Sequence, residues 1–237
     1  MFKSFLILSL AALLAGCVSF GGGGQQIAPQ SQKVPTVSGR PLPANSPIIA
    51  VVQRLEPVAE SVCRQQGRAA NCDFIVAVDD DPMQPPNAFQ TLDPSGFPVI
   101  VFTVSLLDAT RNADEIAFVL GHEAAHHVLG HIAQRKRQAR SGAILAGIVS
   151  QVVGLGASEA AEVQQIAAGL SAQQYSKEFE LQADALGAQI ALAAGFDPIR
   201  GAGFFARLPD PGPGSSHPSN AQRYSAVVEA VRKMRAY

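Results

Sequence analysis

The chain has 237 residues, with 18 Lys and Arg against 19 Asp and Glu, which gives a formal net charge of −1 at pH 7. This balance offers no broad electrostatic reason to expect nucleic acid as a partner, so any charge preference must be local. The composition is 47% hydrophobic but only 6% aromatic, with no Trp. It favours a helix-rich fold with a core of Ala, Val, Leu and Ile.

The first seventeen residues have the pattern of a secretory leader. Lys3 precedes an apolar stretch over residues 5–15, and small residues then lead to Cys17. The stretch is shorter than the ~20 apolar residues that cross a bilayer; an uncleaved anchor or an ordinary signal peptide is the alternative interpretation. The segment LAGC at residues 14–17 resembles the bacterial lipobox. This resemblance implies a signal peptide over residues 1–16, lipidation of Cys17 and, because no Asp follows Cys17, an outer-membrane lipoprotein on the periplasmic face.

Residues 17–46 predict a flexible tether, and residues 47–237 predict one folded domain. Four consecutive glycines, scattered Gln and Ser and several prolines leave the tether without the apolar periodicity that a core needs. A tether of this kind would let the domain stand away from the membrane.

The first half of the domain predicts one helix and a small β-meander. Apolar residues recur at helical spacing over residues 47–68, and Pro57 favours a kink or a break within them. Strands are expected over residues 73–79 and 97–103, with an extended segment at 87–91 and a turn at 93–96 between them. Cys63 and Cys72 lie between the helix and the first strand. In an oxidising compartment they are expected to form a disulfide, with two buried thiols as the alternative.

The second half of the domain predicts helices. Asn112 is a suitable N-cap for a helix that reaches about residue 140. The almost uncharged segment 142–157 is interpreted as a buried hairpin helix or, alternatively, as a segment that dips into the membrane interface. Further helices are expected over residues 158–195, from 198 to about 208, and over 220–235. With the strands, these helices predict an α+β fold that is mainly α.

The segment GHEAAHHVLGH at residues 121–131 holds four of the five histidines and carries the strongest functional signal. His122 and His126 are four residues apart, so on a helix their Cβ atoms lie roughly 5–6 Å apart and both rings can reach one ion. Glu123 is rotated about 100° from His122, which keeps it off the metal but within reach of a metal-bound water, as a general base requires. This is the H-E-x-x-H pattern of zinc peptidases, in which Zn²⁺ polarises the scissile carbonyl and acidifies the attacking water.

His127 and His131 form a second pair four residues apart, but no Glu follows His127. A metzincin arrangement would need Gly at position 129 and His at position 132, where this chain has Leu129 and Ile132. We therefore interpret His127 and His131 as residues that pack, form hydrogen bonds or lie on the surface.

A catalytic zinc needs three protein ligands and an open position, so the third ligand must lie elsewhere in the chain. Glu180 and Asp184 are also four residues apart on an expected helix, in KEFELQADALG. This spacing would let Glu180 bind the metal while Asp184 accepts a hydrogen bond from a ligand imidazole. Glu178 is the rival ligand, and a solvated helix face is the alternative for these acids.

Four ordered segments together resemble a known family. They are NAFQTLDPSGFPVIVFTVSLLDAT, GHEAAHHVLGH, EFELQADALG and SSHPSNAQR, and with their surroundings they span about residues 47–235. They are similar to the gluzincin peptidases of the HtpX and CAAX-prenyl-protease type, particularly the soluble periplasmic and lipoprotein members. The chain lacks the several membrane-spanning helices of the integral-membrane members, which argues against prenylated or intramembrane substrates.

This resemblance implies a zincin-like metallopeptidase domain with a small sheet beside the active-site helix. It implies one Zn²⁺ held by three ligands, Glu123 as the base, Asp184 and Arg223 as supporting residues, and His217 near the metal. His217 could donate to the oxyanion, could block the zinc in a resting state, or could be a turn residue without a role. The ligands implied are His122, His126 and Glu180.

The resemblance also places the strand at residues 97–103 at the sheet edge beside the cleft, where an extended peptide can pair with it. Asn87, Ala88 and Phe89 would then form part of the cleft wall. Plain core packing is the alternative for Phe89 and Phe97.

These expectations describe a zinc endopeptidase of the bacterial cell envelope that hydrolyses misfolded or unassembled envelope proteins, a substrate class that the resemblance implies. The expected partners are protein or peptide substrates, the membrane through a lipid anchor, and the outer-membrane assembly machinery. Nucleic acid is not expected. One alternative is a periplasmic chaperone or assembly factor with latent proteolysis. Another is a storage or structural zinc protein, which would fill all four zinc positions with protein ligands.

Overall fold

The computed structural model describes residues 36–37, 40–41, 46–172, 175–212, 215 and 217–236. All of them belong to one unit, Lys33–Tyr237, while the unit Met1–Gln32 lies outside them. The expected signal peptide, the expected lipidation residue Cys17 and most of the expected tether therefore fall outside the described residues.

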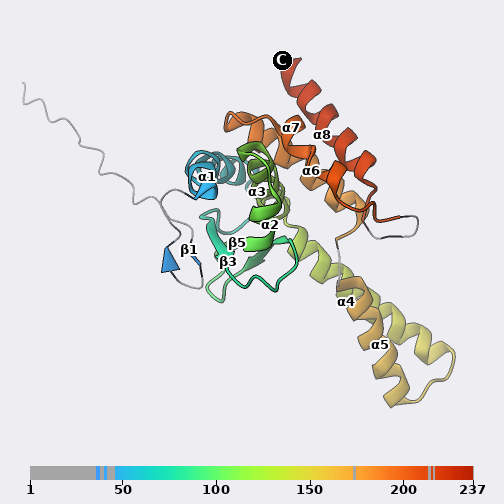
Figure 1. Cartoon of the computed structure of the whole chain (residues 1–237). Helices are drawn as coiled ribbons and strands as arrows, with labels where there is room; N and C mark the ends of the chain where they lie inside the picture. The colour runs from blue at the N-terminus through green and yellow to red at the C-terminus, as the bar shows by residue number, and fades with distance from the viewer. Residues whose placement is uncertain are drawn as a thin grey trace, which may run out of the picture. The chain divides into compact units, whose positions relative to one another are not determined.

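Helices form most of the described chain, as the sequence predicts, and a small sheet completes an α+β fold (Figure 1). Within the described ranges, every helix is too short or too polar to cross a lipid bilayer. The helices are α1 (Pro47–Gln66), α2 (Val104–Ala109), α3 (Ala113–Val128), α4 (His131–Val152), α5 (Ala157–Ala172), α6 (Lys177–Ala193), α7 (Pro198–Ala202), the 3-10 helix η1 (Phe205–Arg207) and α8 (Asn220–Arg235).

The sheet has the strand order β2-β1-β3-β5-β4. Its strands are β1 (Thr36–Val37), β2 (Arg40–Pro41), β3 (Ile75–Asp79), β4 (Ala88–Leu92) and β5 (Pro98–Thr103). β1 and β2 fall within the range expected to be a tether, and β1 pairs in parallel with β3. β5 runs parallel to β3 on one side and antiparallel to β4 on the other.

The expectation that residues 97–103 form the sheet edge is wrong, because β4 occupies that position. The turn after β4 begins at Asp93, whose side chain accepts hydrogen bonds from the backbone N–H groups of Ser95 and Phe97. It folds β4 back onto the outer side of β5. The more apolar strand, β5, is thus covered on both sides, and the more polar β4 is left at the edge.

Helix α3 is central to the domain and packs against α1, α6, α7, β4 and β5 (Figure 1). Twelve of its sixteen residues are buried. Asn112 caps its N-terminus as predicted, accepting a hydrogen bond from the backbone N–H of Glu115 at 3.1 Å. Helix α1 runs unbroken through Pro57. A residue on α3 is therefore held by neighbours on several sides.

Two helices that the sequence predicts as continuous are interrupted. The helix expected from residue 112 to 140 ends at Val128, and α4 begins at His131 after Gly130, whose φ is 70°. Glycine adopts this left-handed conformation without the steric cost that a side chain would add. The helix expected over residues 158–195 consists of α5 and α6.

The segment 142–157 forms the end of α4 and the turn into α5, so a helical hairpin is present, but its predicted burial is wrong. Ile144, Ile148 and Val152 are 66%, 54% and 81% exposed. Helix α4 packs against α5 and, more weakly, against α3. Its outward side has no apolar neighbour among the described residues, and this explains the exposure.

A close contact between two glycines brings α3 and α6 together. A Cβ atom added to Gly121 would lie 2.6 Å from the carbonyl oxygen of Gly187, and one added to Gly187 would lie 2.6 Å from the backbone nitrogen of His122. The obstructing atoms are backbone atoms in both cases. The two helices can therefore approach this closely only because both positions lack a side chain.

We expect Gly187→Ala to destabilise the fold by about 1–3 kcal/mol, because the methyl group overpacks a backbone contact that cannot relax without moving a helix. Urea unfolding measures this loss. Gly147→Ala is the matched control, since Gly147 is also within a helix but its Cβ would meet only the flexible side chain of Gln164. The control should be neutral or slightly stabilising. Wild-type stability in Gly187→Ala would contradict this explanation of the helix contact.

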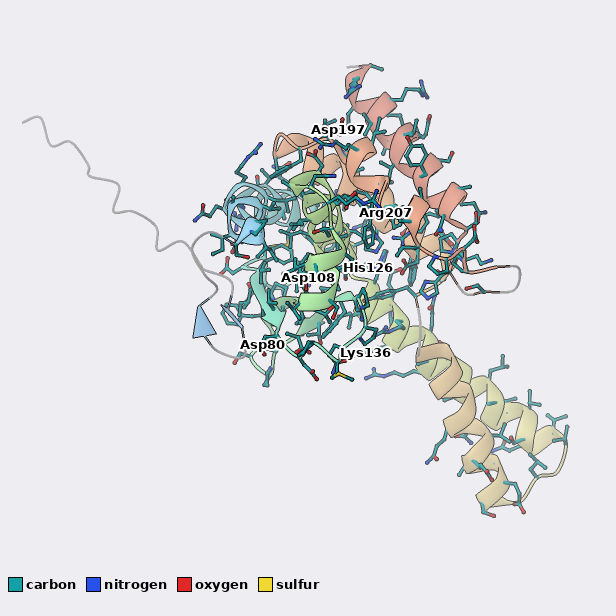
Figure 2. All side chains as sticks on the ribbon, in the orientation of Figure 1. Asp80, Asp108, His126, Lys136, Asp197 and Arg207 are labelled. Atoms are coloured by element: carbon teal, nitrogen blue, oxygen red, sulfur yellow. A yellow bond between two sulfur atoms is a disulfide. The ribbon has the colours of Figure 1, made fainter. Side chains whose placement is uncertain are left out.

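The N-terminal turn of α3 contains a buried ion pair. Glu115 is 2% exposed, and both of its carboxylate oxygens accept hydrogen bonds from Arg207, at 2.7 and 2.6 Å. Burial alone would raise the pKa of Glu115, but these bonds and the backbone N–H of Arg111 lower it below the ordinary value. Arg207, labelled in Figure 2, thereby connects η1 to α3.

We expect Arg207→Ala to cost roughly 2–3 kcal/mol of unfolding free energy at pH 7, because it leaves a buried carboxylate without its partner. A carboxylate with a depressed pKa in the folded state contributes stability above its ordinary pKa of 4.5 and loses it as the pH falls through the folded value. Unfolding at several pH values should therefore show the difference from wild type shrinking below pH 4.5. A difference that grows on acidification would refute the assignment. Arg232→Ala, on the exposed Glu229 pair, should leave the midpoint unchanged.

Candidate metal centre

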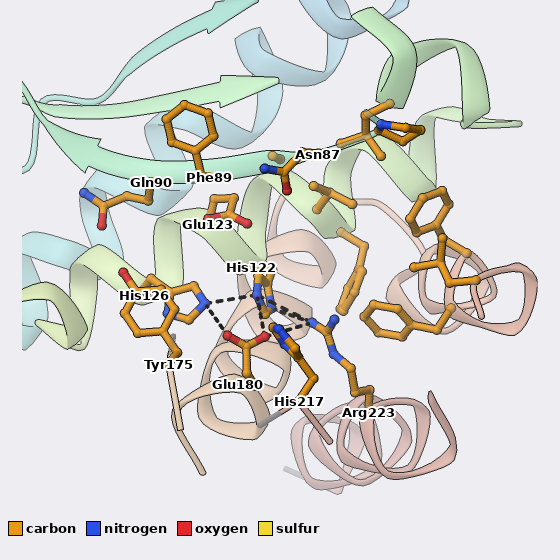
Figure 3. A pocket seen from close by; sticks show the side chains of 18 of the residues that line it. Asn87, Phe89, Gln90, His122, Glu123, His126, Tyr175, Glu180, His217 and Arg223 are labelled. Carbon is orange, nitrogen blue, oxygen red and sulfur yellow. Dashed lines mark hydrogen bonds and ion pairs between the residues drawn. The ribbon is translucent and has the colours of Figure 1, made fainter. Parts of the chain in front are cut away.

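Three buried side chains converge where α3 and α6 meet (Figure 3). The Nε2 atoms of His122 and His126 are 3.0 Å apart. Each is 3.6 Å from a carboxylate oxygen of Glu180. The ligand atoms of these three residues all lie within 4.8 Å of one another. The structure thus brings together the two histidines and the acid that the sequence predicts as ligands.

This donor set fits a zinc ion. Tetrahedral zinc with bonds of about 2.0–2.1 Å requires its donor atoms to be about 3.3 Å from one another. The separations of 3.0 and 3.6 Å bracket that value. Two imidazoles and one carboxylate are also the donor types found at catalytic zinc sites, where a fourth position stays open.

Local structure sets the direction of each ligand. His122 and His126 occupy successive turns of one face of α3. Glu180 lies in the first turn of α6, whose start is fixed by Ser176, since its side chain accepts a hydrogen bond from the backbone N–H of Phe179. Glu178 points elsewhere: it is exposed, accepts a hydrogen bond from Gln182 and is not part of the cluster.

Asp184 orients His122. The Nδ1 atom of His122 lies 2.9 Å from Oδ1 of Asp184, so its N–H donates a hydrogen bond to the carboxylate, and Nε2, which carries no proton, is left free for a metal. Arg223 on α8 donates to both oxygens of Asp184, at 2.8 and 2.6 Å. Burial alone would raise the pKa of Asp184, but His122 and Arg223 lower it. Asp184 therefore stays ionised and able to accept.

His126 is oriented by a different group, His131. The two Nδ1 atoms are 2.9 Å apart, and His131 is fully buried. Because Nε2 of His126 faces the cluster, its Nδ1 carries the proton, and this N–H donates a hydrogen bond to Nδ1 of His131. Neutral His131 then donates from Nε2 to Oε1 of Gln182 at 3.2 Å, and Gln182 donates to Glu178 at 3.1 Å.

The charge states of both rings agree with this chain of hydrogen bonds. Burial is the largest cause that keeps the pKa of His126 well below its ordinary value. Burial also lowers the pKa of His131 to about 4. Both rings are therefore neutral near pH 7, so each has one nitrogen to donate and one to accept. The sequence assigned His131 no specific role; its contact with His126 depends on the break at Gly130.

We expect His131→Ala to weaken zinc binding 10–100-fold, because His126 loses the acceptor that fixes its ring. Competition with a chromogenic chelator measures this affinity without any need for catalysis. His127→Ala is the control, since His127 is adjacent in sequence to His126 but bonds to Asn71 instead. Unchanged zinc affinity in His131→Ala would show that His131 serves packing alone.

Aromatic rings hold the imidazoles of His126 and His131 in place. Tyr175 stacks on His126, with ring centroids 4.0 Å apart and an interplanar angle of 16°. Phe179 stacks on His131 at 4.4 Å and 9°. Tyr175 lies just before α6, and no motif in the sequence pointed to it. Its contact arises only from the docking of α6 on α3.

Glu123 lies beside the cluster without belonging to it (Figure 3). Its side chain is buried, with 8% of the residue exposed. Burial is the largest cause that raises the pKa of Glu123 to about 7, and the backbone N–H of Gln90 on β4 opposes it by hydrogen bonding. A carboxyl group with a pKa near neutrality can both accept and release a proton.

A cavity of about 570 Å³ opens over the cluster. Asn87, Ala88 and Phe89 line it, as the sequence predicts, together with Gln90 and Thr91. Edge strand β4 therefore forms one wall. His217 and Arg223 also line the cavity, and Figure 3 shows His217 on the side where Glu180 and Arg223 lie. The role of His217 stays a prediction.

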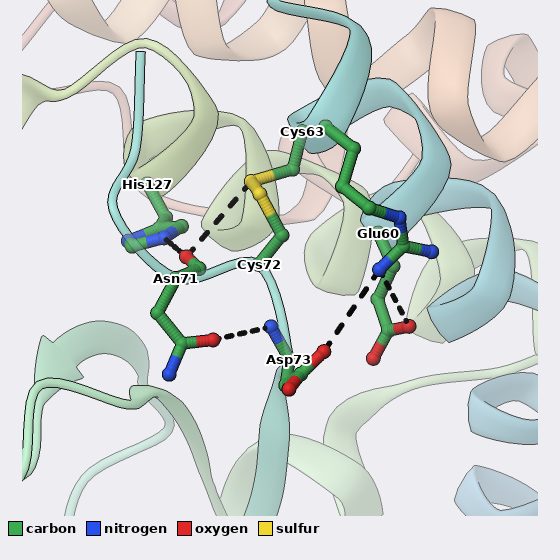
Figure 4. The surroundings of a disulfide bond; sticks show 7 residues. Glu60, Cys63, Asn71, Cys72, Asp73 and His127 are labelled. Carbon is green, nitrogen blue, oxygen red and sulfur yellow. Dashed lines mark hydrogen bonds and ion pairs between the residues drawn. A yellow bond between two sulfur atoms is a disulfide. The ribbon is translucent and has the colours of Figure 1, made fainter. Parts of the chain in front are cut away.

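The predicted disulfide between Cys63 and Cys72 is present, with Asn71 and His127 beside it (Figure 4). It joins the end of α1 to the segment before β3. The carbonyl oxygen of Asn71, next to Cys72, accepts a hydrogen bond from Nε2 of His127 at 2.6 Å. His127 also packs edge-on against Phe74. His127 thus connects the disulfide loop to α3, away from the metal ligands.

Comparison with known proteins agrees with this geometry. The sequence model of peptidase family M48 matches residues 50–231, which is more than half of the chain. A comparison with curated proteins gives no match. The matched range contains all three clustered ligands, Glu123, Asp184 and His217.

Proposed function

The chain belongs to peptidase family M48, and from this membership and the site geometry we propose that it is an endopeptidase that cleaves misfolded or unassembled proteins of the bacterial cell envelope. Family membership makes the chain a zinc-dependent metallopeptidase. The observation that carries the finer proposal is the convergence of His122, His126, Glu180 and Glu123 at a cavity with an edge strand as one wall.

The residues of the site divide the chemistry among them. His122, His126 and Glu180 would hold the zinc ion, which would supply Lewis-acid activation of the scissile carbonyl and of the attacking water. Glu123 accepts the proton of that water and passes it to the departing amine. His217 donates a hydrogen bond to the developing oxyanion or, in a resting state, blocks the site. Asp184 and Arg223 keep His122 in the tautomer that leaves Nε2 free.

Edge strand β4 supports an extended, unfolded substrate. Only β5 pairs with β4 among the described strands, so the backbone groups on its other side can pair with a peptide. Such pairing recognises the peptide backbone and depends little on the side chains. It therefore suits substrates that are recognised because they are unfolded.

The envelope location rests on two features. The leader and the lipobox-like segment before Cys17 support export and lipid anchoring in the outer membrane, facing the periplasm. The disulfide between Cys63 and Cys72 supports an oxidising compartment, where such bonds persist. The outer-membrane assembly machinery is the partner we propose beyond the substrates themselves.

Hydrolysis of casein, an unfolded polypeptide, tests the proposal. We expect cleavage at internal bonds, abolished by a chelator and restored by zinc, with mass spectrometry locating the cuts. Release of terminal residues alone would contradict an endopeptidase. Suppression of client aggregation without any cleavage, in the zinc-loaded protein, would instead support a chaperone.

A further inference from the structure

Helix α4 exposes a row of large aliphatic side chains on one side. We call this row the α4 face. Its five members are all more than half exposed, and the turn after the helix adds Val153 at 63% and Leu155 at 42%. The members are Ile144 (66%), Leu145 (62%), Ile148 (54%), Val149 (51%) and Val152 (81%). Contiguous apolar surface of this kind marks an interaction site.

The α4 face points away from α5. Gly147 faces Gln164 of α5, and Ser150 is buried, so these two residues mark the side of α4 that α5 covers. At 100° per residue, the centre of the α4 face lies roughly 160° around the helix from that side. Glu159 and Glu162 belong to α5 and therefore to the opposite layer of the hairpin.

Positive charge adjoins the α4 face. Helix α4 contains four basic residues and no Asp or Glu, in a chain whose net charge is −1. Arg135 turns toward Tyr175, while Lys136, Arg137 and Arg140 are exposed, as Figure 2 shows for Lys136. At 100° per residue, Arg137 and Arg140 lie within about 40° of Ile144 around the helix axis, one to two turns before it.

We propose that the α4 face docks on the surface of a lipid bilayer with anionic headgroups. An apolar strip with adjoining Lys and Arg matches the boundary between acyl chains and anionic headgroups, with the helix axis in the plane of the membrane. A second copy of this chain would bring the same positive side chains to the contact. The like charges would repel each other, whereas anionic headgroups would neutralise them. The docking depends only on the surface of α4 and is independent of peptidase activity.

The test uses a fluorescent label on the full chain. Cys17→Ser is the background, and Cys63 and Cys72 are joined, so only an introduced thiol reacts. An environment-sensitive dye is attached at Val149→Cys, on the α4 face, or at Met83→Cys, which is 87% exposed and lies outside the hairpin. Vesicles of phosphatidylethanolamine with phosphatidylglycerol are compared with vesicles of phosphatidylcholine, and both contain a spin-labelled quencher lipid.

We expect the dye at position 149 to shift to the blue and to be quenched by the anionic vesicles, while the dye at position 83 stays in water. Arg137→Glu with Arg140→Glu should weaken the effect at least tenfold, and both positions are exposed, so folding is unaffected. Equal quenching at both positions would show attachment through another segment and would overturn the proposal. So would a blue shift that needs no vesicles and grows with protein concentration, because a second copy would then cover the α4 face.

Discussion

Glu123→Gln is expected to lower kcat for peptide hydrolysis by about 10²–10⁴-fold while zinc content stays at the wild-type level. The amide has nearly the same shape as the carboxyl group but cannot accept the proton of the attacking water. Glu123 lies outside the group of three metal ligands, so its replacement should not release the metal. This variant should therefore lose activity while it keeps its zinc.

Casein hydrolysis and metal analysis on the same preparation measure both quantities. Glu162→Gln, at an exposed position on α5, controls for the chemical change and should be fully active. Near-normal hydrolysis by Glu123→Gln would refute the assignment of the base. Loss of zinc along with activity would place Glu123 among the ligands and contradict the geometry.

The site could be predicted from the sequence wherever its residues lie on one helix. The spacing of His122 and His126 determines the relative position of their side chains once α3 forms. The same holds for Glu180 and Asp184 on α6. The need for a third ligand suggests that the two helices meet, and the family resemblance implies it. The structure gives the physical reason, which is the contact of Gly121 with Gly187. Both glycines lie within the quoted motifs, but a single sequence does not show which glycines face each other.

Residues that reach the site through tertiary packing escaped prediction. His131 contacts His126 because Gly130 ends α3 and turns the chain. In a continuous helix the two rings would point in different directions, since five residues correspond to a rotation of about 140°. Tyr175 reaches His126 only after α6 docks. Helical periodicity carries no signal for either contact.

The errors in the fold have similar causes. The sequence predicts burial of the apolar segment 142–157 because apolar residues are usually buried, yet the nearest helix covers only one side of α4. The edge of the sheet was misplaced because strand pairing depends on how the turn after β4 folds back. The greater apolar content of β5 compared with β4 was the available signal that β5 is the inner strand.

The central claim is that two imidazoles on α3 and one carboxylate on α6 hold a single zinc ion, and the zinc content of matched acid variants tests it most directly. Glu180→Ala should lose both zinc and hydrolysis. Its affinity for zinc should fall by more than the 10–100-fold expected when a residue that only orients a ligand is removed. Glu178→Ala, two residues away at an exposed position, should keep about one zinc ion per chain, as three ligands and an open position predict. Retention of stoichiometric zinc by Glu180→Ala, or its loss from Glu178→Ala, would contradict the account.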